Sequence, residues 1–435
     1  MNVATEAPPY QKGLDFARRT DRQDPLARFR DRFHLPKTAD GEDEIYLCGN
    51  SLGLQPSSAA DYVTAELDSW RRLGVKGHFE GAFPWMPYHE LLTRTMAELV
   101  GGEETEVVTM NSLTANLHLM MVSFYRPTRE RHRILIENHA FPSDHHAVES
   151  QIKFHGYDPA RSMLLLTPRD GEELIREEDV CDILEREGES IALIMLPGVQ
   201  YYTGQVFDMA EITRLGHKKG CSVGFDLAHA AGNIPLSMHE WGADFAVWCT
   251  YKYLNSGPGS VAACFVHARH GNNADLPRFS GWWGHDKATR FEMATHFKPI
   301  PGAEGWQLSN PSILSLAAIR ASLDVFADAG HMAPLREKSV RLTGYLEWLL
   351  TEELGGKVEM ITPRDPDRRG CQLSLKLKGK SDTGRNMFKR LEVAGVTGDW
   401  REPDVIRLAP VPLYNRFEDC YRFVEIFKAL ERDSA

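Results

Sequence analysis

The 435-residue sequence contains no uninterrupted apolar run near the ~20 residues that a membrane-spanning helix requires. Its start, MNVATEAPPYQKG, lacks the basic and then apolar segments of a secretory signal. The seven cysteines are odd in number and include no CxxC pair, which predicts reduced thiols rather than a disulfide framework. These absences predict a protein of a reducing, cytoplasmic compartment with no membrane partner.

Basic residues are not in excess either. The chain has 50 Lys and Arg against 61 Asp and Glu, a net charge of −11, which disfavours a nucleic-acid or anionic membrane partner. A composition of 42% hydrophobic and 26% charged residues excludes a disordered or fibrous chain. The length predicts one large and one smaller domain, and the absence of repeats and low-complexity linkers predicts that they pack closely.

What the sequence does contain, in its middle part, is an alternation of short apolar runs with helical segments. Near-continuous apolar strands that alternate with helices are typical of an α/β domain with a mostly parallel sheet. Helices are expected at 26–33, 57–73, 88–100 and 209–219. The strands are expected at 106–110, 133–136, 162–166, 191–196, 221–225, 244–248 and 261–267.

The last third of the chain has a different pattern, with longer helices and fewer strands, which predicts a smaller α+β domain. We expect three domains or segments: an N-terminal arm with helices near the small domain (1–80), the large domain (81–325) and the small domain (326–435). Residues 1–20 are polar and are expected to form the arm. The C-terminal helices are expected at 313–329, 335–353 and 417–430, and the strands at 357–361, 371–377 and 405–409.

The stretch WCTYKYLNSGPGS places Lys252 between two tyrosines, just before a glycine–proline turn. Such a lysine either extends its ammonium to water along the rings or serves as an amine nucleophile that holds an aldehyde cofactor as a Schiff base. Asp226 ends the expected strand CSVGF, where open α/β sheets bind ligands. It is either a helix cap or a carboxylate that keeps a heterocyclic nitrogen protonated.

Two further segments follow expected strands. In MNSLTANLHLM, Leu113 and Thr114 open a helix whose N-terminus either binds a phosphate or is merely capped. In HAFPSDHHAVES, Phe141 can stack on a flat cofactor and Asp144 can supply a second carboxylate. His145 and its neighbours lack further ligands in a recognisable set, so no metal site is predicted.

An ordered set of segments extends these features over residues 48–415. The segments are CGNSLG, FPSD, VQYYTGQ, FDLAHAAGN, YKYLNSGPG, GWWGH, LSNPSIL and IRLAPVPLYN. The set resembles the kynureninase family of pyridoxal-phosphate enzymes, which have the aspartate-aminotransferase fold (fold type I). The resemblance implies hydrolysis of L-kynurenine to anthranilate and L-alanine in tryptophan catabolism, and it leaves open the 3-hydroxy analogue, which would give 3-hydroxyanthranilate.

The resemblance also implies roles for individual residues. Lys252 carries the cofactor and moves the substrate Cα proton, Asp226 pairs with the pyridinium nitrogen, and Tyr251 binds the phosphate. Tyr251 is also our candidate acid for protonating the β-carbanion. Trp282 and Asn310 reach across from the neighbouring subunit, so a homodimer with a shared active site is implied. The other cofactor contacts implied are Leu113, Thr114, Phe141, Pro142, Ser143, Asp144, Pro197 (serine in some relatives) and His229.

Substrate contacts are implied at Arg407, which holds the carboxylate by two hydrogen bonds, and at His78 and Asn310 near the aromatic ring. The alternatives from the same fold are a cysteine desulfurase, a selenocysteine lyase or an aminotransferase. A desulfurase needs a thiol on a mobile loop, and Cys371 is the late cysteine to consider. A non-catalytic, cofactor-binding regulator is the alternative from another class.

Overall fold

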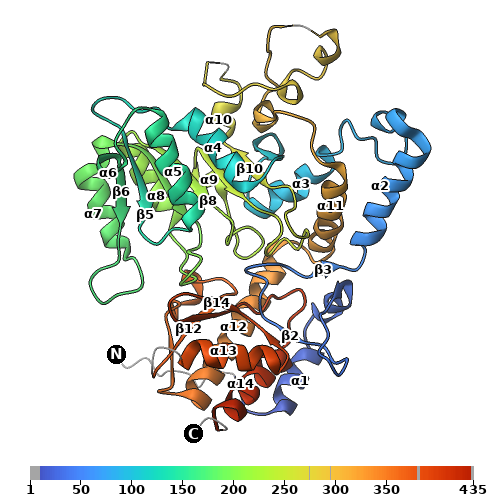
Figure 1. Ribbon diagram of the computed structural model, residues 1–435, viewed down its shortest axis with the longest axis vertical. Helices are drawn as coiled ribbons and strands as arrows, with labels where there is room; N and C mark the ends of the chain where they lie inside the picture. Colours follow the sequence, from blue (N-terminus) through green and yellow to red (C-terminus); the bar gives the residue numbers. More distant parts are fainter. Residues whose placement is uncertain (1–9, 274, 294, 380–382, 433–435) are drawn as a thin grey trace.

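The computed structural model describes residues 10–273, 275–293, 295–379 and 383–432, and its larger part contains one seven-stranded sheet (Figure 1). Its strands are Val107–Thr109 (β4), Arg133–Glu137 (β5), Met163–Leu166 (β6), Ile191–Pro197 (β7), Ser222–Asp226 (β8), Phe245–Trp248 (β9) and Ala263–Val266 (β10). Their order is β4-β10-β9-β8-β7-β5-β6. β10 is antiparallel to both neighbours, and every other adjacent pair is parallel. All seven match strands predicted from the sequence.

Helices cover both faces of this sheet, and side chains alternate between them. In β5, Ile134 and Ile136 belong to one apolar core and Leu135 to the other. Burial on both faces explains why the strands are nearly continuous apolar runs, and it confirms the predicted α/β class. Leu113–Phe124 (α4) and Pro142–Phe154 (α5) pack in the first core; Glu90–Val100 (α3), Glu177–Glu187 (α7), Met209–Lys218 (α8) and Ile313–Asp328 (α11) pack in the second.

A smaller α+β unit follows, as predicted. Its antiparallel sheet has the order β11-β12-β15-β14, formed by Val358–Met360, Leu373–Leu377, Val405–Leu408 and Asp399–Arg401, respectively. A third apolar core joins this sheet to its helices. Neither β14 nor α13 was predicted from the sequence. β14 is a short polar strand without the apolar alternation that indicates a strand. The helices are Met332–Leu354 (α12), Thr383–Val393 (α13) and Phe417–Arg432 (α14).

The N-terminal segment corrects two expectations. Residues 1–9 of the arm predicted over residues 1–20 lie outside the described residues, and from Leu14 onward the prediction is wrong, because Leu14–Arg22 forms helix α1. Asp21 in this helix accepts the backbone N–H groups of Phe417 (2.7 Å) and Glu418 (3.0 Å) at the start of α14, so α1 is fastened to the small unit. The predicted helix at 26–33 is a tighter 3-10 helix, Ala27–Arg32.

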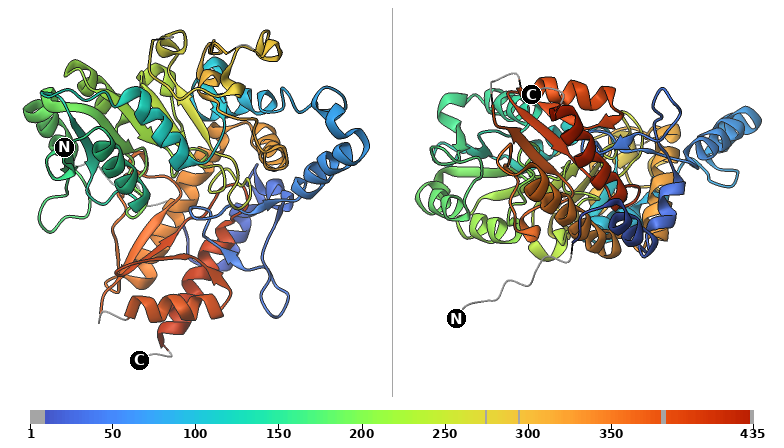
Figure 2. Two further views of the ribbon diagram at one scale, coloured as in Figure 1. Left: turned by 45° about the horizontal axis from the view of Figure 1, so that its top comes forward. Right: turned by 90° about the horizontal axis from the view of Figure 1, so that it is seen from below.

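The helix Ala59–Leu73 (α2) packs against α11 and projects sideways from the molecule (Figure 2). Within the described part of the chain, no helix combines the length and apolar character needed to cross a bilayer.

The carboxyl ends of the parallel strands face the small unit. The loop after β7 accepts a hydrogen bond from Gln372 Nε2 at the Tyr201 carbonyl (2.9 Å), and the loop after β8 accepts the Cys371 N–H at Asn233 Oδ1 (2.8 Å). Open α/β sheets bind ligands at this edge. Both units therefore contribute to the place where a ligand is expected.

Candidate active site

Lys252 lies in a tightly held loop between β9 and β10. The Thr250 hydroxyl donates to the Val261 carbonyl (2.7 Å) and fixes the two ends of the loop to each other. Gly257 and Gly259 adopt positive φ angles of 91° and 67°, which side chains with a Cβ rarely tolerate. The NSGPG turn therefore gives the half-buried Lys252 side chain a defined position at the carboxyl end of the sheet.

The Lys252 amine points at a buried histidine. Its Nζ lies 3.1 Å from His229 Nε2 and 5.8 Å from the centre of the Phe141 ring. Burial and the nearby Lys252 ammonium hold the pKa of His229 well below its usual range. The imidazole is therefore neutral at physiological pH, and its Nε2 lone pair accepts a hydrogen bond from Lys252. His229 Nδ1 is buried without a partner in the described structure.

Two buried carboxyl groups lie beside this pair. Asp226 ends β8 opposite Pro197 of β7, and its Oδ1 accepts the Ala228 N–H (2.6 Å). Burial and the neighbouring Asp226 charge raise the pKa of Asp144 well above its usual range. Burial also raises the pKa of Asp226, while the Lys252 ammonium and a hydrogen bond with Asp144 oppose that rise. Of the two carboxyl groups, Asp144 therefore has the more strongly raised pKa, and Asp226 has the greater tendency to carry the negative charge.

Two helix N-termini complete the constellation. Helix α4 begins at Leu113 and helix α5 at Pro142, and the Thr114 and Ser143 hydroxyls lie 2.8 Å apart between them. N-terminal N–H groups and hydroxyls together form a site suited to a phosphate. Phe141, directly before α5, leaves its ring partly exposed.

One pocket contains these groups. Most of the predicted cofactor residues line it, together with several residues that the sequence analysis did not single out. The predicted residues in the lining are Leu113, Thr114, Phe141, Ser143, Asp144, Pro197, Asp226, His229, Tyr251 and Lys252. The additional ones are Glu137, Ala140, Val199, Tyr201 and Ala228. Pro142 is absent from the lining and occupies the first turn of α5.

Glu137 is the most informative of the residues that were missed. It ends β5, as Asp226 ends β8, so the rule that selected Asp226 could also have found it. Its side chain is buried and accepts the His139 N–H (2.9 Å) and Gln200 Nε2 (3.3 Å). Glu137 thereby ties the loop that carries Phe141 to the loop after β7. Burial raises the pKa of Glu137 from 4.5 to about 7.

This raised pKa predicts a pH-dependent stability. Between about pH 4.5 and 7 folded Glu137 keeps a proton that the unfolded chain has released, so its contribution to stability falls as pH rises through that window. Glu137→Gln removes this ionisation. We expect its unfolding free energy, relative to the unsubstituted protein, to increase by about 2 kcal/mol from pH 5 to pH 7.5 in urea titrations. The exposed Glu359→Gln serves as control, and a pH-independent difference for Glu137→Gln would contradict the assignment.

Arg407 lies next to the pocket without lining it. The side chain is completely buried in β15, and Nη1 donates to the Tyr201 carbonyl (2.6 Å). Tyr201 in turn lines the pocket and contacts Phe141 edge-on, with ring centres 5.4 Å apart. Burial lowers the pKa of Arg407 to about 10, so the guanidinium remains charged at neutral pH.

The remaining predicted residues lie away from the pocket of this chain. His78 ends a 3-10 helix after α2 and packs edge-on against Trp85 at 5.3 Å. Trp282 is 45% exposed and donates to the Arg290 carbonyl (3.1 Å), and Asn310 is exposed just before α11. None of the three lines the pocket that contains Lys252.

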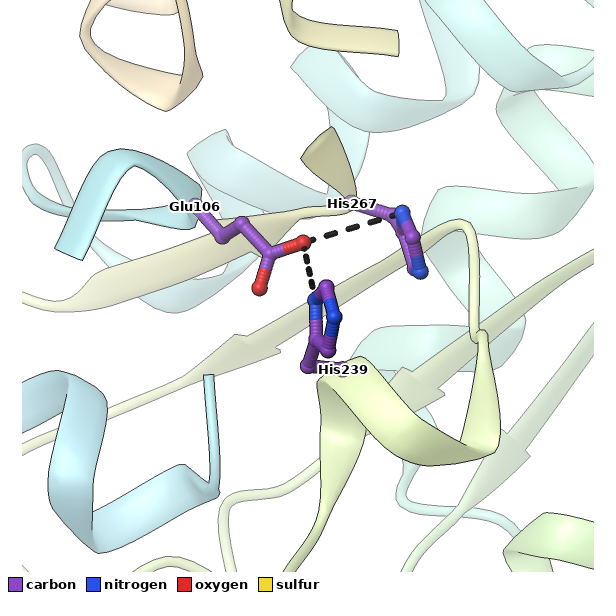
Figure 3. Close-up of side chains that lie close together, drawn as sticks. All are labelled: Glu106, His239 and His267. Carbon is purple, nitrogen blue, oxygen red and sulfur yellow. Dashed lines mark hydrogen bonds and ion pairs between the residues drawn. The ribbon is translucent and has the colours of Figure 1, made fainter. Parts of the chain in front are cut away.

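A second cluster of titratable groups lies at the opposite edge of the sheet (Figure 3). Glu106 Oε1 accepts hydrogen bonds from the Ala268 N–H (2.7 Å) and His239 Nδ1 (2.9 Å), and lies 3.6 Å from His267 Nδ1. His267 Nδ1 accepts the Arg269 N–H (3.2 Å). Because protein donors occupy these lone pairs, we assign the cluster a structural role: it connects β4, α9 (Met238–Trp241) and the end of β10.

Comparison with known proteins identifies the family. Residues 335–427 match the family model for the kynureninase C-terminal domain. A kynureninase of Koribacter versatilis is 59% identical over 95% of this chain and 97% of its own length. A kynureninase of Myxococcus xanthus is 56% identical over 98% and 99%, respectively. The chain belongs to the kynureninase family.

Solved structures show the same fold at much lower sequence identity. The cysteine desulfurase CsdA of Escherichia coli superposes with a TM-score of 0.74 at 16% identity, covering 94% of this chain and 98% of its own. A cysteine desulfurase of Thermococcus onnurineus superposes with a TM-score of 0.72 at 15% identity, covering 90% of this chain and 95% of its own. The family and the fold predicted from the sequence are confirmed, and with them the class: a pyridoxal-phosphate-dependent hydrolase of carbon–carbon bonds.

Proposed function

We propose that this chain hydrolyses L-kynurenine to anthranilate and L-alanine. One observation carries the proposal: a lysine, a buried carboxyl pair and two helix N-termini meet in one pocket, in a chain 59% identical to a kynureninase. The pocket fits pyridoxal phosphate. The helix N-termini suit its phosphate, Phe141 its ring face and Asp226 its ring nitrogen, and the unpartnered His229 Nδ1 offers a further polar contact.

When bound, the cofactor supplies an electron sink for the substrate's Cα and Cβ. The chain's own groups do the remaining work. Lys252 Nζ anchors the cofactor and then moves the Cα proton, and neutral His229 orients this amine by accepting a hydrogen bond from it at Nε2. Burial raises the pKa of Tyr251, so this phenol is protonated and has a proton to donate to Cβ. Arg407 binds the α-carboxylate from the small unit.

We further propose a homodimer in which Trp282 and Asn310 complete the partner's pocket. Support comes from exposed apolar side chains directly after the 3-10 helix that follows α2 and between residues 282 and 293: Phe79, Trp282, Phe291 and Met293 are each 45% or more exposed, and the Phe291 ring contacts those of Phe79 and Trp282. Patches of this kind mark protein interfaces. A cytoplasmic location agrees with the seven free cysteines. We also propose domain limits of 1–80 for the N-terminal arm and its helices, 81–325 for the large domain and 326–435 for the small domain.

The desulfurase alternative lacks a suitable thiol at Cys371. This side chain is 1% exposed, contacts the Ser339 hydroxyl (3.4 Å) and has a pKa raised to about 11 by burial. A buried, protonated thiol is a poor nucleophile.

To test the proposed function, the cofactor-loaded protein is incubated with L-kynurenine and anthranilate fluorescence is followed. Sulfide released from L-cysteine and keto acid formed from L-alanine are then measured with the same protein. Sulfide or keto acid without anthranilate would overturn the proposal.

A further inference from the structure

Arg407 does not act alone, because a carboxylate from the neighbouring strand holds it. Asp399 of β14 lies directly opposite Arg407 of β15, and its Oδ2 forms an ion pair with Arg407 Nη2. Nη1 donates to the Tyr201 carbonyl, while Nε and Nη2 are buried and have no hydrogen-bond partner in the described structure. The guanidinium is therefore held by one hydrogen bond and one ion pair, and the Nε edge, formed by the N–H groups of Nε and Nη2, is left for a ligand.

A second arginine shares the same carboxylate. Arg401 lies two residues from Asp399, on the same side of β14, and donates to Asp399 Oδ2 from Nη2 (3.1 Å) and Nε (3.3 Å). Two guanidiniums and one carboxylate leave the cluster with one net positive charge. A single bound carboxylate would neutralise that charge.

The cluster borders the catalytic pocket. The Arg407 guanidinium lies 5.9 Å from the centre of the Tyr201 ring, and Tyr201 lines the pocket. Both arginines also contribute to the lowered pKa of His229, the residue that contacts Lys252. Their charges thus act at the site of the reaction.

We propose that Asp399 is the positioning residue of the carboxylate subsite: it orients Arg407 so that the Nε edge meets the substrate's α-carboxylate. The proposal rests on the proposed function and assigns to β14 a role that the sequence analysis did not foresee. In the alternative model, Asp399 competes with the substrate: it occupies Arg407 until the substrate's carboxylate displaces it. The two models predict opposite changes in KM when the charge of Asp399 is removed.

The test is Asp399→Asn in the cofactor-loaded enzyme. We expect KM for L-kynurenine to rise about tenfold and kcat to stay within about threefold, because a neutral amide holds a guanidinium weakly. Asp399→Glu, which keeps the charge, should give a KM between those of the unsubstituted enzyme and Asp399→Asn. Arg401→Gln should raise KM about threefold. Glu431→Gln, which removes the acid of a surface ion pair with Lys357, is the control. An unchanged or lower KM in Asp399→Asn would overturn the proposal.

A binding experiment separates this proposal from the proposed function. The holoenzyme is titrated with L-alanine and with L-alaninamide, which lacks the carboxylate, and the visible absorption of the cofactor is followed. Asp399→Asn should weaken L-alanine binding about tenfold and leave L-alaninamide binding unchanged. Equal weakening of both ligands would indicate general damage and contradict the assignment. An unsubstituted enzyme that shows this preference but makes no anthranilate would refute only the proposed function.

Discussion

Lys252→Ala is expected to abolish anthranilate formation, with a loss of at least about 10⁴-fold in kcat. The reason is that Lys252 supplies the amine that anchors the cofactor and moves the Cα proton. No other lysine lines the pocket, and His229, 3.1 Å from Nζ, cannot replace an amine. The measurement is anthranilate fluorescence with excess pyridoxal phosphate, combined with the visible absorption of the protein.

The matched control is Lys357→Ala, a lysine that pairs with Glu431 on the surface. It should keep full activity and the visible absorption band. Lys252→Ala should remain folded, since the side chain makes no ion pair in the described structure and its loop is held by Thr250 and the glycine turn. Turnover above a few per cent in a folded Lys252→Ala protein would exclude Lys252 as the catalytic amine.

Asp226→Asn is expected to lower kcat by about 10²–10³-fold, equivalent to roughly 3–4 kcal/mol in the activation barrier. The buried carboxylate next to the ring nitrogen stabilises its protonated form, and a neutral amide does not. The substitution preserves shape, because the amide oxygen can still accept the Ala228 N–H that Asp226 Oδ1 accepts at 2.6 Å. Single-turnover and steady-state assays with L-kynurenine would measure the effect.

Asp144→Asn provides the comparison. Because the pKa of Asp144 is raised more strongly than that of Asp226, Asp144 has the weaker tendency to carry charge, so a neutral amide is the milder replacement there and we expect a loss of only about tenfold. The order of the two losses is therefore the test: if Asp144→Asn were the more damaging substitution, the charged carboxylate would have to be assigned to Asp144.

The apolar patterns predicted the fold well. All seven strands of the large sheet coincide with predicted runs. Strands buried on both faces must be apolar along their whole length, and only the edge strand β6 exposes an apolar side chain, that of Leu165, to a large extent. The errors fall where the sequence pattern is weak. Helix α1 is mostly polar and is stabilised at its end by Asp21, which caps α14 some 400 residues later. β14 is a polar three-residue strand recognisable only beside β15.

The candidate site divides in the same way. Strand ends and helix starts, both visible in the sequence, drew attention to Asp226, Thr114 and Asp144. The flanking tyrosines and the glycine–proline turn drew attention to Lys252, and all four residues meet in one pocket. Glu137 could have been found by the same rule. Tyr201 could not, because nothing in VQYYTGQ shows that its carbonyl meets Arg407, more than 200 positions later.

The sequence by itself determined the strands of the large sheet, most of the reactive groups and the family, since these depend on local apolar patterns and ordered motifs. The tertiary structure alone decided how those groups act on one another. The pKa of Asp144 is raised and that of His229 is lowered only because packing removes both side chains from water beside a neighbouring charge. Asp399 meets Arg407 only because the register of β14 on β15 places them together. Burial and strand register arise from contacts between distant segments, so no local pattern in the sequence specifies them.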